Sequence, residues 1–306
     1  MDESAPAKPV VSPAKPSIWE RQPQGLFLYA VLWVTLCCPG VMTLYILHPL
    51  VRFRSLAWAI GEEASFAFAA LVALGIMIGF VQHKPLVGAG FDARGMVFET
   101  LIGLVIGCGL ISVVVGILSM TGHMHTVARH AGYVAWPAAV FCLMIAISEE
   151  TIFRGYMLAE FERQWGTATG LIASSLIFGA MHLVNVQHEP LALQLRATLF
   201  IAVEAGLLLG AAYLATRRLW MPIGIHWAWN FFLGPYYGVP VSGTNLMGSF
   251  SVAHLTGPAW ITGGAFGPEA GIVTLCVCSV AAFALLIVTA RSGRWRAVPS
   301  PVPSDG

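Results

Sequence analysis

The densest group of ionisable residues in the sequence is the run SEETIFR at 148–154, which directly follows the apolar stretch FCLMIAI. Glu150 and Arg154 are four residues apart, so on a helix they share one face and can pair. Glu149 points about 100° away from that face, and its partner must come from another helix or from water. A helix-packing ion pair would explain Glu150 and Arg154, but it leaves the second carboxylate unexplained.

Two further polar motifs lie on separate apolar segments. His182 ends the run FGAMH, and HWAWN places His226 and Asn230 four residues apart, on one helix face. Each motif taken alone also fits ordinary packing between helices. Together, however, a carboxylate and an imidazole can deprotonate water, and two donors on one face can hold an oxyanion. The three segments therefore favour hydrolysis of an acyl bond inside a membrane.

The motifs E-E-x-x-x-R, F-x-x-x-H and H-x-x-x-N, in this order on three hydrophobic segments, resemble the CPBP family of intramembrane proteases. That family includes the type II CAAX prenyl endopeptidases and the bacteriocin-processing and immunity (Abi) proteins. The resemblance covers roughly residues 134–268, including the runs LWMPIGIHWAWNF and TGGAFGPEA. A single motif would be weak evidence, whereas three in order are specific.

The resemblance implies an intramembrane endopeptidase that cleaves a membrane-associated peptide or protein. By position, Glu149 and His182 would activate the attacking water. His226 and Asn230 would stabilise the oxyanion of the tetrahedral intermediate.

The resemblance also implies that Glu150 and Arg154 hold the site together. Members of the family have been described both as metalloproteases and as metal-independent glutamate proteases, so the cofactor stays open. If a divalent metal such as zinc is bound, Glu149, His182 and His226 can supply three ligands and leave one open position.

The composition of the chain indicates that the elements positioning these residues lie in a membrane. Of the 306 residues, 57% are hydrophobic and 10% are charged, against about 25% charged in an ordinary soluble protein. Lipid is therefore the expected solvent for most of the chain. Lys+Arg 16 and Asp+Glu 15 leave a net charge of +1, which gives no concentrated basic surface for nucleic acid.

We predict an all-α fold, a polytopic membrane bundle of about eight transmembrane helices. About 20 mostly apolar residues are needed to cross roughly 30 Å of hydrocarbon, and the stretches that meet this length are apolar on all sides. The predicted spans are residues 26–48, 64–82, 96–120, 134–158, 168–187, 197–216, 219–239 and 270–290.

Lys and Arg in the loops favour the cytoplasmic side of a membrane protein. With eight spans, one side collects Lys8, Lys15, Arg21, Lys84, Arg94, Arg163, Arg217, Arg218, Arg291, Arg294 and Arg296. The other side collects only Arg52, Arg54, Arg129 and Arg196. We therefore predict a multi-pass protein of the plasma membrane with both termini in the cytoplasm.

Proline-rich, polar ends flank the apolar part of the chain. They predict a disordered cytoplasmic tail at 1–24 and a disordered C-terminal tail at 292–306. The transmembrane protease domain is then 25–291, with the motif core at 134–268.

Two other functions fit buried acids and histidines. A proton-coupled transporter could use them as a relay, but transporters usually show internal repeats, and no motif here has a second copy. A catalytically silent family member could act as an immunity factor or scaffold, although every motif residue is present.

Two more intramembrane acids have no partner in their own helices. We expect Glu204 to reach Arg154 or a water-filled cavity, and Glu99 to snorkel towards the membrane surface.

Three other segments carry weaker signals. Gly103 and Gly107 have the spacing that permits close approach of another helix. The histidine-rich loop at 123–130 is either solvated or metal-binding. Residues 240–268 are Gly-rich and uncharged, and we expect them to form a re-entrant segment or to cap the site.

Overall fold

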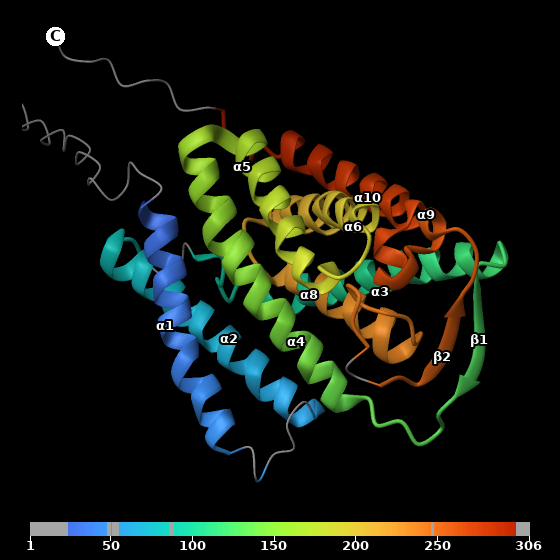
Figure 1. Cartoon of the computed structure of the whole chain (residues 1–306). Coiled ribbons are helices and arrows are strands. Elements are labelled where there is room, and N and C mark those ends of the chain that lie inside the picture. The colour runs from blue at the N-terminus through green and yellow to red at the C-terminus, as the bar shows by residue number, and fades with distance from the viewer. Residues whose placement is uncertain (1–23, 48–49, 51–54, 86–88, 246–247, 298–306) are drawn as a thin grey trace, which may run out of the picture.

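The computed structural model describes residues 24–47, 50, 55–85, 89–245 and 248–297 and is mostly helical (Figure 1). Its longer helices are α1 (Gln24–Ile46), α2 (Leu56–Ile76), α3 (Met96–Met120), α4 (Trp136–Glu150), α5 (Ala159–Met181), α6 (Leu191–Ile201), α7 (Leu208–Thr216), α8 (Trp220–Phe231) and α10 (Ile272–Arg291). Short π-helices extend or join them at η2 (Met77–Val81), η4 (Thr151–Leu158), η6 (Ala202–Leu207) and η7 (Phe232–Tyr236). The remaining short elements are η5 (His182–Val186), α9 (Ala259–Thr262), η8 (Gly264–Phe266) and η9 (Pro268–Ala270).

Six helices among the described residues are long and apolar enough to cross a membrane, so the chain is an integral multi-pass membrane protein. The predicted number of about eight spans is not confirmed. The spans predicted at 134–158 and 168–187 are both present within Trp136–Val186, as two helices that meet at a kink at Gly166 with φ 79° and ψ 169°. A Cβ atom on Gly170 would collide with the backbone at Phe161 and Glu162, so the second helix packs back against the end of the first. The span predicted at 219–239 is only α8 with η7, which together are too short to be counted.

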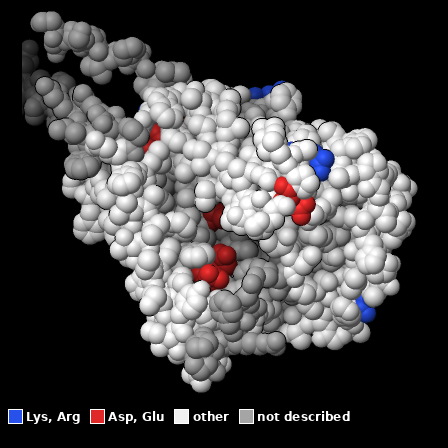
Figure 2. All heavy atoms as spheres, viewed as in Figure 1, with Lys and Arg blue, Asp and Glu red and all other residues white. Residues whose placement is uncertain are grey.

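Large apolar side chains cover much of the outer surface. Phe98 and Val105 of α3 and Phe283 of α10 are exposed. The space-filling view shows a face with few charged residues, apart from acidic residues inside a hollow (Figure 2). Such a surface is costly in water and suits hydrocarbon.

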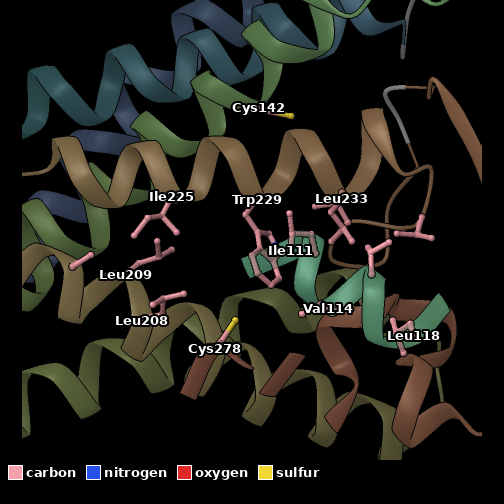
Figure 3. Packing of buried hydrophobic residues seen from close by; sticks show 14 of the residues in the cluster. Ile111, Val114, Leu118, Cys142, Leu208, Leu209, Ile225, Trp229, Leu233 and Cys278 are labelled. Atoms are coloured by element: carbon pink, nitrogen blue, oxygen red, sulfur yellow. The ribbon is translucent and has the colours of Figure 1, made fainter. Parts of the chain in front are cut away.

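The central contact of the bundle is α3 against α8, and glycine allows it. A Cβ atom on Gly103 or Gly107 would collide with the backbone of α8 at Met221 or Ile225, and one on Gly224 would collide with the carbonyl oxygen of Thr100. The close approach expected from the spacing of Gly103 and Gly107 is thereby confirmed. Around this contact, side chains of α3 and α8 pack against those of α7 and α10 (Figure 3).

Two short strands lie at the opposite edge of the bundle from α1 and α2 (Figure 1). β1 (Met124–Arg129) pairs antiparallel with β2 (Ser251–Leu255), with Met124 opposite Leu255. Neither strand is predicted from the sequence, because a strand pair this short carries almost no periodic signal. The pairing fastens the histidine-rich segment to the Gly-rich segment at 240–268.

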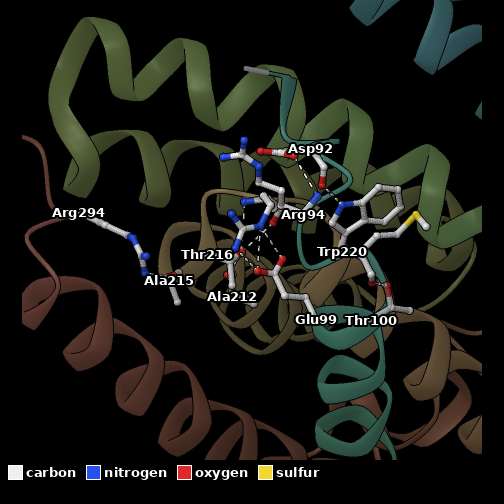
Figure 4. Close-up of polar contacts among 11 residues, drawn as sticks. Asp92, Arg94, Glu99, Thr100, Ala212, Ala215, Thr216, Trp220 and Arg294 are labelled. Carbon is white, nitrogen blue, oxygen red and sulfur yellow. Dashed lines mark hydrogen bonds and ion pairs between the residues drawn. The ribbon is translucent and has the colours of Figure 1, made fainter. Parts of the chain in front are cut away.

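One end of the bundle, which we call the arginine end, is held by paired charges. Its ion pairs are Glu99–Arg218, Glu160–Arg163, Glu162–Arg217 and Glu162–Arg296. Glu99 therefore does not snorkel as expected. It is buried and accepts hydrogen bonds from Arg218, which raise the pKa of that guanidinium. Figure 4 shows Glu99 beside Thr216 at this end, together with Asp92 and Trp220.

The chain after α10 is also tied to the arginine end. Thr167 donates its backbone N–H to the carbonyl oxygen of Arg296 at 3.0 Å, and the N–H of Arg296 donates to the Thr167 hydroxyl at 2.9 Å. These bonds hold the described part of the predicted tail, 292–297, against the turn at Gly166. The predicted tail residues 1–23 and 298–306 lie outside the described residues.

Candidate active site

The acidic motif lies where α4 changes into the π-helix η4. Such π-helical turns are rare and are common at functional sites. Glu150 is fully buried and accepts a hydrogen bond from Nη1 of Arg154 at 2.7 Å. The pairing predicted from their spacing is thus confirmed. Arg154 donates its other hydrogen bonds to the carbonyl oxygens of Ala205 and Gly206, at 3.0 and 3.3 Å.

Glu150 also fixes the orientation of an imidazole from another helix. Nδ1 of His226 in α8 lies 2.8 Å from Oε1 of Glu150. Because a carboxylate accepts hydrogen bonds, Nδ1 is the protonated nitrogen in this contact. Nε2 of His226 is left pointing towards Glu149, whose Oε2 lies 3.9 Å away.

Glu149 differs from Glu150 in having no hydrogen-bond partner. Its side chain is 29% exposed, and its Oε2 atom is buried without a hydrogen bond to any described residue. The separation of 3.9 Å from His226 is too long for a direct hydrogen bond. One carboxylate oxygen is therefore free to accept a proton or a hydrogen bond from a molecule in the cavity.

Phe178 connects the two histidines. His182 is the first residue of η5, and its Nδ1 lies 2.9 Å from the carbonyl oxygen of Phe178. The Phe178 ring packs 4.9 Å from the His182 ring and 6.5 Å from the His226 ring, measured between centroids. The guanidinium of Arg154 lies over its face at 4.4 Å, a favourable cation–π position.

A cavity of about 600 Å³ brings the four predicted catalytic side chains together. Glu149, His182, His226 and Asn230 all line it. Glu150 and Arg154, predicted as supporting residues, lie behind its wall. Most of its lining is apolar, with a few polar groups that converge, as is usual for a ligand site.

The possible metal ligands do not form a ready coordination site. In the described parts of the chain, no group of three or more His, Cys, Asp or Glu side chains is placed to hold a metal ion. His182 and His226 each engage Nδ1 within the protein, with a carbonyl and with Glu150, which leaves Nε2 of each ring available. As placed in the structure, Glu149, His182 and His226 are not gathered into one set of three ligands.

The histidines of the 123–130 segment are likewise engaged within the protein. His123 contacts the hydroxyl of Thr121, and His125 and His130 contact backbone carbonyl oxygens. The hydrogen bonds fasten the ends of β1 and do not gather the rings.

Three further acids line the same cavity, and two of them are not predicted from the sequence. Glu63 lies on α2 and lines the cavity. The span predicted there starts at residue 64, which places Glu63 in a loop outside the membrane. Glu269 ends the run TGGAFGPEA just before α10. Glu204 was singled out correctly as a cavity residue, but it does not meet Arg154, which binds the two carbonyl groups that follow Glu204 in η6.

Glu269 is the most constrained of these acids. Nε1 of Trp229 donates to its Oε1 at 2.9 Å, and the backbone N–H of Ser242 donates to its Oε2 at 2.5 Å. Burial raises the pKa of the Glu269 carboxyl above its usual range, and these hydrogen bonds act in the opposite direction. With Val241 and Thr244, these residues bring the 240–268 segment against the cavity, so the segment closes part of the site.

Comparison with known proteins identifies one region of the chain. Residues 131–232 match the family model described as Rce1-like, type II CAAX prenyl endopeptidase Rce1-like. The matched region runs from before α4 to the end of α8 and contains all six predicted site residues. It stops before the 240–268 segment. No curated protein and no solved structure gives a significant match to the chain.

Proposed function

We propose that this membrane protein is an active endopeptidase, on the premise that residues 131–232 form a domain of the Rce1-like CAAX protease family, whose members are intramembrane proteases. The observation that carries the proposal is the free Oε2 atom of Glu149. It faces Nε2 of His226 on the wall of a cavity that His182 and Asn230 also line. The substrate is a membrane-associated peptide or protein.

In the proposed reaction, Glu149 is the general base. Water that enters the cavity gives one proton to the Glu149 carboxylate, with His182 positioning it, while its oxygen forms a bond to the carbonyl carbon of the peptide. The π electrons of the carbonyl group move onto its oxygen, which becomes the oxyanion. Glu149 then returns the proton to the nitrogen of the leaving amine as the C–N bond breaks.

The oxyanion is held by His226 and Asn230, which lie one helical turn apart on α8. Glu150 accepts a hydrogen bond from Nδ1–H of His226, and carboxylates on both sides of the ring favour an imidazolium that also carries a proton on Nε2. Asn230 supplies an amide N–H. Arg154 neutralises Glu150 and thereby keeps His226 in this orientation.

The test is cleavage of a membrane peptide by the purified protein in lipid vesicles. We expect Glu149→Gln to lower kcat/KM by about 100-fold to 10,000-fold, the range for loss of a general base. His182→Ala should also lower it strongly. Glu62→Gln is the matched control, because Glu62 lies next to Glu63 on α2 but does not line the cavity. Equal cleavage by the parent and Glu149→Gln would refute the proposed site.

We propose that catalysis does not depend on a metal, because the acid and the two histidines do not form one ligand set. Prolonged treatment with a chelator, followed by removal of the chelate, should leave the cleavage rate unchanged. Loss of cleavage that zinc alone restores would overturn this part of the proposal.

We also propose that the protein lies in the plasma membrane with both termini in the cytoplasm. Arg163, Arg217, Arg218 and Arg296 gather in the ion pairs of the arginine end, which is the side that the loop charges assign to the cytoplasm. A reporter that is active only in the cytoplasm, fused to the C-terminus, should be active. An inactive reporter on a fusion that still cleaves peptide would reverse the orientation.

A further inference from the structure

The charged groups that line the cavity are nearly all acidic. Its lining contains the carboxylates Glu63, Glu149, Glu204 and Glu269, with the imidazoles of His182 and His226. No lysine or arginine lines the cavity within the described ranges. The nearby Arg154 is already shared between Glu150 and two carbonyl groups. The catalytic proposal uses only one of the four acids.

Glu204 is buried at the cavity wall without a partner. It lies in η6, its side chain is 2% exposed, and its Oε2 atom makes no hydrogen bond. An unpaired carboxyl in such surroundings costs free energy that a partner group would recover. The orphaned oxygen therefore indicates a ligand group that approaches from the cavity.

Glu269 supplies a second carboxylate with a fixed direction. Trp229 and Ser242 hold both of its oxygens by donating hydrogen bonds, which leaves lone pairs on each oxygen for a further donor. Glu204 and Glu269 both line the cavity, as does Cys278 of α10. Ala270, which follows Glu269, lies in one buried cluster with Ile201, three residues before Glu204, so the two acids enter the cavity from neighbouring elements.

Glu204 and Glu269 lie close to the proposed catalytic residues. Trp229, which donates to Glu269, lies next to Asn230 on α8 and three residues after His226. His182 lines the same cavity as Glu269. A group bound between Glu204 and Glu269 would lie beside the proposed oxyanion site, and so close to the bond that is cleaved.

We propose that Glu204 and Glu269 form an acidic subsite that binds the cationic side chain of a lysine or arginine near the cleaved bond of the substrate. The inference rests on the proposed peptidase function. Two carboxylates in a water-poor site bind an ammonium or guanidinium group well, since each charge offsets the desolvation of the other. A metal ion is a poorer occupant, because these acids belong to no three-ligand group.

The first experiment compares N-acetylated peptides that differ at one position. Lysine, arginine or uncharged norleucine is placed in turn at each position next to the cleaved bond. For the parent protein, we expect lysine or arginine at one of these positions to raise kcat/KM by about tenfold to a hundredfold over norleucine, as for a buried charged hydrogen bond. The two basic residues distinguish an ammonium site from a guanidinium site.

Variants of Glu204 and Glu269 test whether these two acids cause the preference for a basic residue over norleucine. Glu204→Gln and Glu269→Gln should each remove most of it, mainly through a higher KM for the basic peptide, while cleavage of the norleucine peptide continues. Glu189→Gln, which changes an acid outside the cavity lining, should keep the full preference. A merely structural role would instead lower cleavage of all three peptides together.

A binding measurement keeps the inference separate from catalysis. Anisotropy of the labelled peptides on the Glu149→Gln variant should show the same preference for the basic peptides, and the preference should vanish when Glu204→Gln is added. Equal binding and equal cleavage of basic and norleucine peptides would overturn the subsite but leave the peptidase intact. No cleavage of any peptide, with basic peptides still bound preferentially, would refute the proposed function and retain the subsite.

Discussion

Carboxylates are buried in two regions of this protein, but only one region supplies their partners. At the arginine end, Glu99, Glu160 and Glu162 each contact at least one arginine. In the cavity lining, Glu204 makes no ion pair, and Glu149 approaches only His226, at 3.9 Å. The chain thus pairs acids fully at one end of the bundle and leaves them unpaired around the cavity.

The difference separates structural acids from functional ones. A paired carboxylate holds helices together, and its hydrogen-bonding capacity is already used. An unpaired carboxylate in the same apolar surroundings adds nothing to folding and is usually kept for a ligand or a reaction. Within the site, Glu269 accepts hydrogen bonds from the neutral donors Trp229 and Ser242. Glu150 is the exception, because it pairs with the cation Arg154 and also contacts His226.

The largest expected effect comes from removing the ion pair between Glu150 and Arg154. Arg154→Met leaves the buried Glu150 without its cation, and we expect the free energy of unfolding to fall by about 3–5 kcal/mol. Cleavage should be lost as well, because His226 would no longer be fixed. Denaturant unfolding in detergent measures the first effect and peptide cleavage the second. Double replacement of Glu150 by Gln and Arg154 by Met should recover stability without activity.

A smaller loss is expected at the arginine end. Glu162→Gln removes the carboxylate that Arg217 contacts at 2.5 and 3.0 Å and that Arg296 contacts at 3.4 Å. The free energy of unfolding should fall by about 1.5–3 kcal/mol, while kcat/KM at low temperature stays near the parent value. A large loss of activity in a stable variant would contradict a purely structural role for this end.

The ion pair between Glu99 and Arg218 should contribute less to stability, because Arg218 is partly exposed to solvent. Arg218 is 31% exposed, so Glu99→Gln should lower the free energy of unfolding by only about 1 kcal/mol, and less at high salt. The difference between unfolding in low-salt and high-salt buffer measures this. A loss as large as that of Glu162→Gln would show that burial of Glu99 outweighs exposure of its partner.

The smallest effect on folding is expected in the cavity. Glu204→Gln removes a carboxylate that has no ion-pair partner, so the free energy of unfolding should stay the same or rise slightly. The matched measurement is Glu162→Gln under identical conditions. If Glu204→Gln destabilises the protein as much, then Glu204 is a structural acid and the contrast between the two regions fails.

Local spacing predicted the parts of the site that lie within single helices. The contact of Glu150 with Arg154, the shared face of His226 and Asn230, and the glycine contact between α3 and α8 all follow from residues three or four positions apart. These features need no knowledge of how distant segments meet.

What spacing could not predict depends on contacts between distant segments. Glu269 becomes a site residue only because Trp229 and Ser242 bind it from other elements. Glu63 was missed because hydropathy locates the start of a helix only to within a few residues. The span count failed for a related reason. The predicted span at 219–239 fell short because α8 with η7 is shorter than a membrane crossing, whereas the two helices that meet at Gly166 match the two spans predicted there.

The π-helix η4 has a consequence for any change in chain length near the motif. It separates Glu149 at the end of α4 from α5, which leads to His182. Its i→i+5 bonds already accommodate more residues per turn than an α-helix does, so one further residue inserted within Thr151–Leu158 would rotate everything before it by about 100° relative to everything after it. The Glu149 carboxylate would then swing out of register with the imidazoles, even though every motif residue would still be present.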